Sequence, residues 1–180
     1  MTSRSSRQSR GLRALTALAT VALLGVLVVA TGPTARAATL VQCQGTETVT
    51  YDPGVTFTPQ DIEVTVRGRF TSCVDGAGQV TSGTYGEQFT ILAGCNDLFD
   101  DFQGRRTVAW NTGDSSVIEG NGSSTAVAGQ VVTTFTGTVV QGRFQGRSAV
   151  QTITLVQPGA LQCLTTGFTR AIGVTTLTIA

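Results

Sequence analysis

Apolar and polar residues alternate along most of the chain after residue 38, which is typical of strands with one buried face. In the stretch DIEVTVRGRF, one side carries Ile62, Val64, Val66 and Phe70, and the other carries Glu63, Thr65, Arg67 and Arg69. The period of two recurs in residues 130–140, 148–156 and 173–180, which are rich in Thr, Val and Ile. No helical period of useful length follows residue 38, so an all-β chain is predicted.

Turn-forming residues separate these segments at short, regular intervals. They are Asp52-Pro53-Gly54, Asp75-Gly76, Asn111 to Asp114, Gly120-Asn121-Gly122, Gln141-Gly142 and Pro158-Gly159. Roughly eight to ten short strands with such punctuation predict a single antiparallel β-sandwich or small β-barrel. Gly68, Gly137 and Gly146 are expected inside strands, at bulges or bends where the sheet curls.

The first 37 residues have the pattern of a secretory signal peptide. Four arginines precede a long apolar run, which is followed by Gly32-Pro33 and by the small-x-small triplet Ala35-Arg36-Ala37. The alternative is a retained membrane anchor, because the run is about long enough to span a bilayer. Cleavage after Ala37 is favoured, and it predicts a secreted, extracellular domain of residues 38–180 without a membrane segment.

Loss of the signal changes the charge of the protein. The whole chain carries +1, but residues 38–180 keep seven arginines against eleven acids, a net charge of −4. An acidic domain with scattered arginines does not attract phosphate backbones, so no nucleic-acid partner is expected. All twelve basic residues are arginine, and this bias and the export signal resemble those of actinobacteria.

Four cysteines, Cys43, Cys73, Cys95 and Cys163, lie in the exported part. An even number in an exported chain predicts two disulfides, for which three pairings exist. A hairpin of residues 43–50 and 61–73 brings Cys43 near Cys73, so the pairing Cys43–Cys73 and Cys95–Cys163 is favoured. The spacing fits no CxxC zinc knuckle.

The composition excludes much catalytic chemistry. The chain has no histidine and no lysine, which removes the commonest general base, Ser-His-Asp arrangements and Schiff-base chemistry. Two carboxylates among Asp97, Asp100, Asp101 and Glu119 could hydrolyse a glycoside. The chain has few aromatic residues with which to hold sugar rings. We therefore expect a non-catalytic protein without a cofactor.

The densest run of acid is CNDLFDDF, residues 95–102. Asp97, Asp100 and Asp101 are interpreted as part of a polar loop or a first helical turn beside Cys95. The alternative is a calcium site, because calcium prefers several carboxylate and carbonyl oxygens. The run contains no EF-hand pattern.

A second candidate is the predicted hairpin turn after Trp110. Asn111 and Asp114 form the turn, and a tryptophan beside it could be presented to a sugar or a protein. The alternative is a core tryptophan that closes one end of the barrel. Trp110, Asn111 and Asp114 are therefore the candidate binding residues.

Three functions remain open. The first is binding of another exported protein, as a subunit, adaptor or inhibitor, with residues 38–42 adding as a strand to the partner. Some actinobacteria secrete multi-subunit antibacterial assemblies with small β-rich connectors, which this chain resembles in general type. The second is a carbohydrate or cell-wall binding module that uses Trp110.

The third function is binding of a small ligand in a barrel. The pentapeptide Gly142-Arg143-Phe144-Gln145-Gly146 is similar to a turn of small antiparallel barrels of the lipocalin-like and allene-oxide-cyclase-like kind. That resemblance covers five residues and implies a barrel with a lumen for an apolar ligand.

Overall fold

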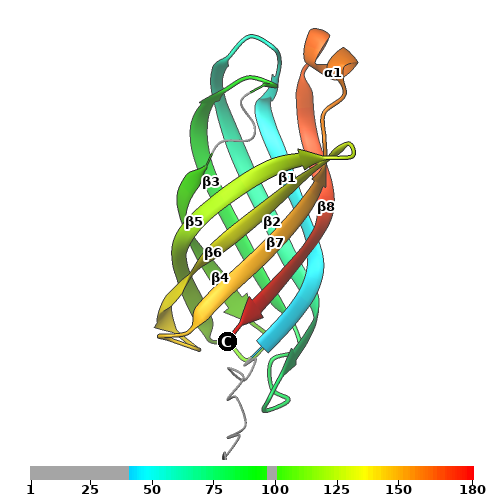
Figure 1. Ribbon diagram of the computed structural model, residues 1–180. Helices are drawn as coiled ribbons and strands as arrows, with labels where there is room; N and C mark the ends of the chain where they lie inside the picture. Colours follow the sequence, from blue (N-terminus) through cyan, green and yellow to red (C-terminus); the bar gives the residue numbers. More distant parts are fainter. Residues whose placement is uncertain (1–40, 97–100) are drawn as a thin grey trace, which may run out of the picture. The chain divides into compact units, whose positions relative to one another are not determined.

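The computed structural model describes residues 41–96 and 101–180, which form one closed antiparallel β-barrel (Figure 1). Each strand pairs with the next along the chain, and the last strand closes onto the first. The elements are β1 (Val41–Val55), β2 (Gln60–Asp75), β3 (Gly83–Ala93), β4 (Phe102–Trp110), β5 (Ser115–Val127), β6 (Gln130–Gly142), β7 (Ser148–Val156), α1 (Ala160–Leu164) and β8 (Phe168–Ile179). The all-β prediction is confirmed, and of the two architectures the barrel is the one found.

The predicted alternation matches the two faces of the barrel wall. On β2, Ile62, Val64, Val66 and Phe70 are all buried inside the barrel. On β6, Val131, Phe135 and Val139 are buried, while Thr134, Thr136 and Thr138 are exposed. The lumen is therefore filled by side chains at many levels, as expected for a barrel of eight strands.

Large aromatic rings pack against glycines on neighbouring strands. Three such pairs are register partners: Gly68 with Tyr85, Gly83 with Trp110, and Gly122 with Phe102. At each glycine an added Cβ would overlap the ring of its partner. The absence of a side chain therefore makes room for an inward-facing ring and lets the sheet curve.

Some predicted turns are wrong. Gly120-Asn121-Gly122 lies in the middle of β5. Glycine is required there because the Thr136 carbonyl lies too close to Gly120 for any side chain. Asp52-Pro53-Gly54 lies within β1, and Gly146 lies in the β6–β7 turn with φ +82° rather than inside a strand. Local glycine and proline signals could not distinguish a turn from a sharply curved strand.

Two disulfides form as predicted. Cys43 and Cys73 are register partners on β1 and β2, with a Cα–Cα distance of 4.0 Å. Cys95, after β3, is joined to Cys163 on α1, with a Cα–Cα distance of 6.3 Å. Two disulfides are typical of oxidising surroundings such as the extracellular space. Within residues 41–96 and 101–180, no helix is long and apolar enough to cross a membrane.

The prediction that residues 38–42 form a free strand for a partner is wrong for residues 41 and 42, the part that the structure describes. Val41 and Gln42 belong to β1, where Val41 pairs with Asp75 on one side and with Ile179 on the other. Their backbone is therefore not available to a partner. The signal-peptide prediction lies outside the described residues.

Candidate functional site

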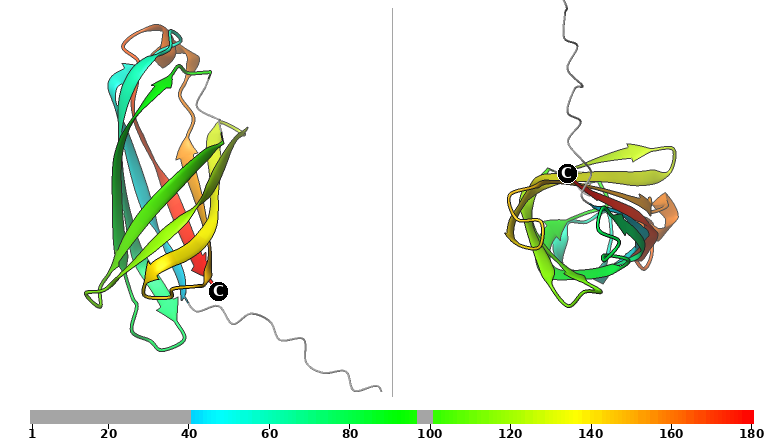
Figure 2. Two further views of the ribbon diagram at one scale, coloured as in Figure 1. Left: turned by 90° about the vertical axis from the view of Figure 1, so that its left-hand side faces the viewer. Right: turned by 90° about the horizontal axis from the view of Figure 1, so that it is seen from below.

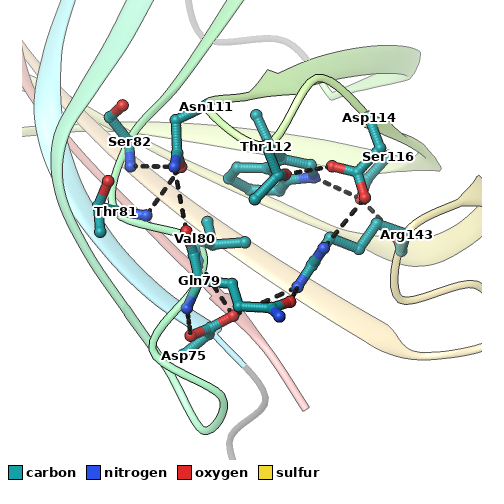
Figure 3. A network of polar contacts seen from close by, with 11 residues as sticks. Asp75, Gln79, Val80, Thr81, Ser82, Asn111, Thr112, Asp114, Ser116 and Arg143 are labelled. Carbon is teal, nitrogen blue, oxygen red and sulfur yellow. Dashed lines mark hydrogen bonds and ion pairs between the residues drawn. The ribbon is translucent and has the colours of Figure 1, made fainter.

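Two of the candidate binding residues, Asn111 and Asp114, lie together at one end of the barrel, in a polar network that closes this end (Figure 3). The third, Trp110, is joined to this network through Ser116. Trp110 is only 4% exposed, and its Nε1 donates a hydrogen bond of 2.9 Å to Ser116 Oγ. The interpretation of Trp110 as a presented binding surface is therefore wrong. Trp110 shares the inward phase of β4 with Val108, so its ring closes the lumen.

Asn111 and Asp114 also serve the fold. Asn111 Oδ1 accepts hydrogen bonds from the backbone N–H groups of Thr81 and Ser82, at 2.8 and 3.1 Å. Asp114 accepts hydrogen bonds from Thr112 Oγ1 at 2.5 Å and from Arg143 at 3.1 Å. These contacts tie the β4–β5 turn to its neighbours. The hydrogen bond from Thr112 and the arginine together lower the pKa of Asp114.

Residues 142–146, the pentapeptide similar to a turn of small antiparallel barrels, form a turn that caps the same end of the barrel. Gly142, Phe144 and Gly146 all have positive φ, at 84°, 66° and 82°. This conformation brings the Phe144 ring edge-on to Trp110, with centroids 5.9 Å apart. Arg143 forms ion pairs with Asp75 at 3.5 Å and with Asp114 at 3.1 Å.

Asp75 is the anchor of this network at the end of β2. Its carboxylate accepts hydrogen bonds from the backbone N–H groups of Gln79 and Val80, at 2.8 and 3.1 Å. Burial acts to raise the pKa of Asp75, but the backbone donors and Arg143 outweigh it and hold this pKa below its ordinary value. The network is therefore a charged plug that keeps this end of the lumen shut.

The acidic run does not form a recognisable site in its described part. Asp101 is exposed, and Asp97 and Asp100 lie outside the described residues. Within the described ranges, no group of three His, Cys, Asp or Glu side chains could hold a metal ion. Glu119 lies on the outer wall, where it forms an ion pair of 3.2 Å with Arg105.

A second polar cluster lies inside the barrel, and our sequence reasoning missed it. It consists of Glu47 on β1, Tyr85 and Glu87 on β3, Arg106 on β4, Gln151 on β7 and Thr175 on β8. All are buried except Glu87, whose side chain is 23% exposed. One signal was available: Gln151 and Thr175 occupy inward positions between apolar residues, where a polar side chain needs a partner.

Arg106 is the centre of this lumen cluster. Its guanidinium contacts both oxygens of Glu87, at 2.5 and 3.3 Å, and donates to Gln151 Oε1 at 2.8 Å. It also lies over the Tyr85 ring, 4.5 Å from the centroid, and 5.6 Å from the centroid of Phe135. The acids Glu87 and Glu47 and the faces of the two aromatic rings thus compensate the burial of this cation.

Glu47 and Tyr85 form the second half of the cluster. Tyr85 donates a hydrogen bond of 2.5 Å to Glu47 Oε2, and Gln151 Nε2 donates to the Tyr85 hydroxyl at 2.8 Å. Burial raises the pKa of Glu47, against the opposing effect of Arg106, and burial also raises the pKa of Tyr85. The polar groups of the cluster are engaged with one another, so it has the chemistry of a structural network.

The seam between β3 and β4 differs from the other seven. These strands keep register over only three residue pairs, from Gly83 with Trp110 to Tyr85 with Val108. Every other neighbouring pair keeps register over at least seven. Beyond Tyr85 the two strands leave their shared end in different directions (Figure 2). Among the residues that the structure describes, 86–93 therefore pair only with β2, and 102–107 only with β5.

Apolar side chains are exposed along this open seam. On β3, Phe89 is 43% and Leu92 72% exposed, and on β4 Phe102 is 42% exposed. Phe89 and Phe102 share the inward phase of their strands with Tyr85 and Arg106, so they belong to the lumen face. The ion pair of Glu87 with Arg106 bridges the seam where it begins to open. The seam is therefore a pair of strand edges with apolar contact residues.

The sequence and the fold were compared with protein-family models, curated proteins and solved structures, and none matches, so the function of this chain must be argued from its own residues.

Proposed function

We propose that this protein is an exported, non-catalytic binding domain that takes up an extended segment of another exported protein at the β3–β4 seam. The observation that carries the proposal is the pair of strand edges left without β partners within the described part of the chain. An inserted strand would pair with both edges and fill the gap in the barrel wall. The partner protein could be an enzyme, a receptor or another subunit of an assembly.

Unpaired strand edges have a strong tendency to bind other strands. Natural proteins usually protect such edges with charged residues, proline or a covering element. From Gln88 to Ala93, β3 carries no charged residue and no proline. The main chain supplies affinity in strand addition, and pockets for alternate side chains supply specificity. The exposed rings of Phe89 and Phe102 can provide such apolar contacts.

The carbohydrate alternative receives less support. It depended on Trp110, whose ring is buried against Phe144 and whose Nε1 is engaged with Ser116. The small-ligand alternative would use the same opening as a mouth to the lumen. The unpaired backbone edges favour the protein segment, because a small apolar ligand would leave those N–H and C=O groups without partners.

The proposal is tested by purifying the tagged protein from its own culture supernatant without reductant and analysing it by native mass spectrometry. We expect a second protein at fixed stoichiometry. In that complex, hydrogen exchange should slow at residues 86–93 and 102–107, because an added strand would protect these amides. Isolation of the protein without a protein partner, or bound only to a small molecule or a glycan, would overturn the proposal.

A pair of charge variants locates the contact. Leu92→Lys with Gln103→Lys places a cation on each edge of the seam, and both side chains are exposed. Binding should weaken at least about tenfold, which is about 1.4 kcal/mol. The matched control is Thr84→Lys with Thr65→Lys, on the same side of the barrel but in fully paired segments. Equal binding by both double variants would place the partner elsewhere.

A further inference from the structure

A second surface of this protein has a distinctive composition, and the proposed function does not explain it. It is the outer wall formed by β1 and by β5 to β8, on which three rows of side chains run across all five strands. The rows are Thr46, Val174, Thr154, Val132 and Thr125; Gln44, Thr176, Thr152, Thr134 and Ser123; and Gln42, Thr178, Val150, Thr136 and Asn121. We call these fifteen positions the threonine wall.

The threonine wall carries no charge. Eight of its fifteen residues are threonine, and the others are valine, glutamine, asparagine and serine. Charged residues begin at its borders: Arg67 and Arg69 on β2, Arg170 near the start of β8, and Glu119 with Arg105. Monomeric proteins usually intersperse charges over such a face, since uncharged strand surfaces promote association.

One half of the wall carries exposed apolar side chains. Val174 is 59% and Val150 43% exposed, and Ile172 and Val156 at its upper border are 48% and 51% exposed. These four side chains lie on β7 and β8, which are neighbouring strands. Val156, Ile172 and Val174 lie at one border of the wall, and Val150 lies in its third row, beyond Thr152 and Thr176.

The other half of the wall is hollowed. A shallow depression of about 560 Å³ lies over β4, β5 and β6. It is lined mainly by uncharged outward side chains of the wall and its border, which are Gln103, Asn121, Ser123, Thr134 and Thr136, with Phe102 and Asp101 at its end. The wall therefore presents both exposed apolar side chains and a depression.

We propose that the threonine wall is a self-association surface, on which two copies of this chain pack face to face around a two-fold axis. In a two-fold interface the same patch occurs on both subunits, so the exposed apolar side chains of each copy can meet the depression of the other copy. An uncharged face is needed here, because residues 38–180 carry a net charge of −4 and any charge near the axis would meet its own copy.

The size of the surface fits this occupant. Standard interfaces use roughly 20–30 residues from each partner. The fifteen wall positions with their uncharged borders on β7 and β8 and the lining of the depression approach this number. Aligned packing of two β-sheets, with rows of branched side chains between them, is a common way for such faces to meet.

Sedimentation velocity of the exported protein tests the proposal, over concentrations up to about 100 µM. We expect a concentration-dependent dimer. Val174→Arg places two like charges near the axis and should raise the dissociation constant at least about a hundredfold. Thr65→Arg, on β2 outside the fifteen positions of the wall, is the matched control and should leave the dimer unchanged. If Val174→Arg lowers the yield of folded protein, Thr176→Arg serves the same purpose.

Several results would overturn the proposal. A monomer throughout this range would do so, as would a dimer that Val174→Arg and Thr176→Arg leave intact. Binding of a glycan or a different protein to the wall of a monomer would show another occupant. The single seam variant Leu92→Lys, whose side chain lies on β3 and does not line the depression, should still dimerise, so failure of the strand-addition proposal and failure of this one are distinguishable.

Discussion

Several ionisable side chains that are rarely buried together lie inside this barrel. Arg106 is buried against Glu87, Glu47, Tyr85 and Phe135, so its charge is matched by two carboxylates and two rings. Burying an ion pair is costly, and removing one partner usually costs more than the pair contributes. The cluster therefore makes one register of the surrounding strands much more stable than any register in which a strand is shifted.

Glu47 gives this cluster a dependence on pH. Its pKa is raised above the ordinary value of 4.5, mainly by burial. As the pH rises above 4.5, the unfolded chain loses this proton first, so the folded state loses stability until the pH exceeds the raised pKa. Glu47→Gln lacks this titration. The free energy of unfolding of Glu47→Gln, relative to that of the wild type, should therefore increase as the pH rises from about 4 to 7.

The measurement is urea unfolding at several pH values, with the disulfides intact. Glu63→Gln, on the exposed face of β2, controls for the general effect of removing one acid from this barrel. A difference between Glu47→Gln and wild type that stays constant with pH, or decreases, would contradict the assigned direction of the pKa.

At the scale of the elements, cross-strand pairs of glycine with an aromatic residue set the curvature of the sheet. Tyr85 illustrates the coupling between packing and chemistry: its ring covers Gly68, and its hydroxyl holds Glu47. The strand β3 is thus fixed to β2 by a ring and to β1 by a hydrogen bond. A change at Gly68 should reach the polar cluster through this one side chain.

Gly68→Ala is expected to lower the free energy of unfolding by about 1–3 kcal/mol, because the new methyl group overpacks against the Tyr85 ring. Gly86→Ala is the matched control, since an added Cβ there meets only the Val66 carbonyl oxygen at 3.4 Å. Chemical unfolding provides the measurement, and near-ultraviolet circular dichroism reports any change in the packing of the aromatic side chains. Equal effects of the two substitutions would mean that the ring has room to move.

The whole molecule is held by closure of the barrel and by its two disulfides. Cys43–Cys73 joins two strands that already pair along their length, whereas Cys95–Cys163 joins the loop after β3 to α1. The second bridge closes 68 residues and the first closes 30. In the chain-entropy account, the longer loop restricts the unfolded chain more.

Removing Cys95–Cys163 with paired serine substitutions should therefore destabilise the protein by about 4 kcal/mol, and slightly more than removing Cys43–Cys73. Urea unfolding of the two double variants gives both values. Hydrogen exchange should in addition become faster at the end of β3 in the Cys95 and Cys163 variant, because that end then loses its tie to α1. A larger loss from the Cys43 and Cys73 variant would contradict the loop-length argument.

The sequence by itself determined the local features of this protein. Alternation on β2 and β6 assigned the buried faces correctly, and the hairpin of Cys43 with Cys73 gave the disulfide pairing, because both depend on residues that are near one another along a strand or a hairpin. Closure of the barrel decided the rest. It turned Trp110 inward, brought Glu47 and Arg106 together from strands far apart in sequence, left the β3–β4 seam open and aligned the threonine wall across five strands. These features depend on register and curvature summed over the whole barrel, which no local pattern of residues specifies.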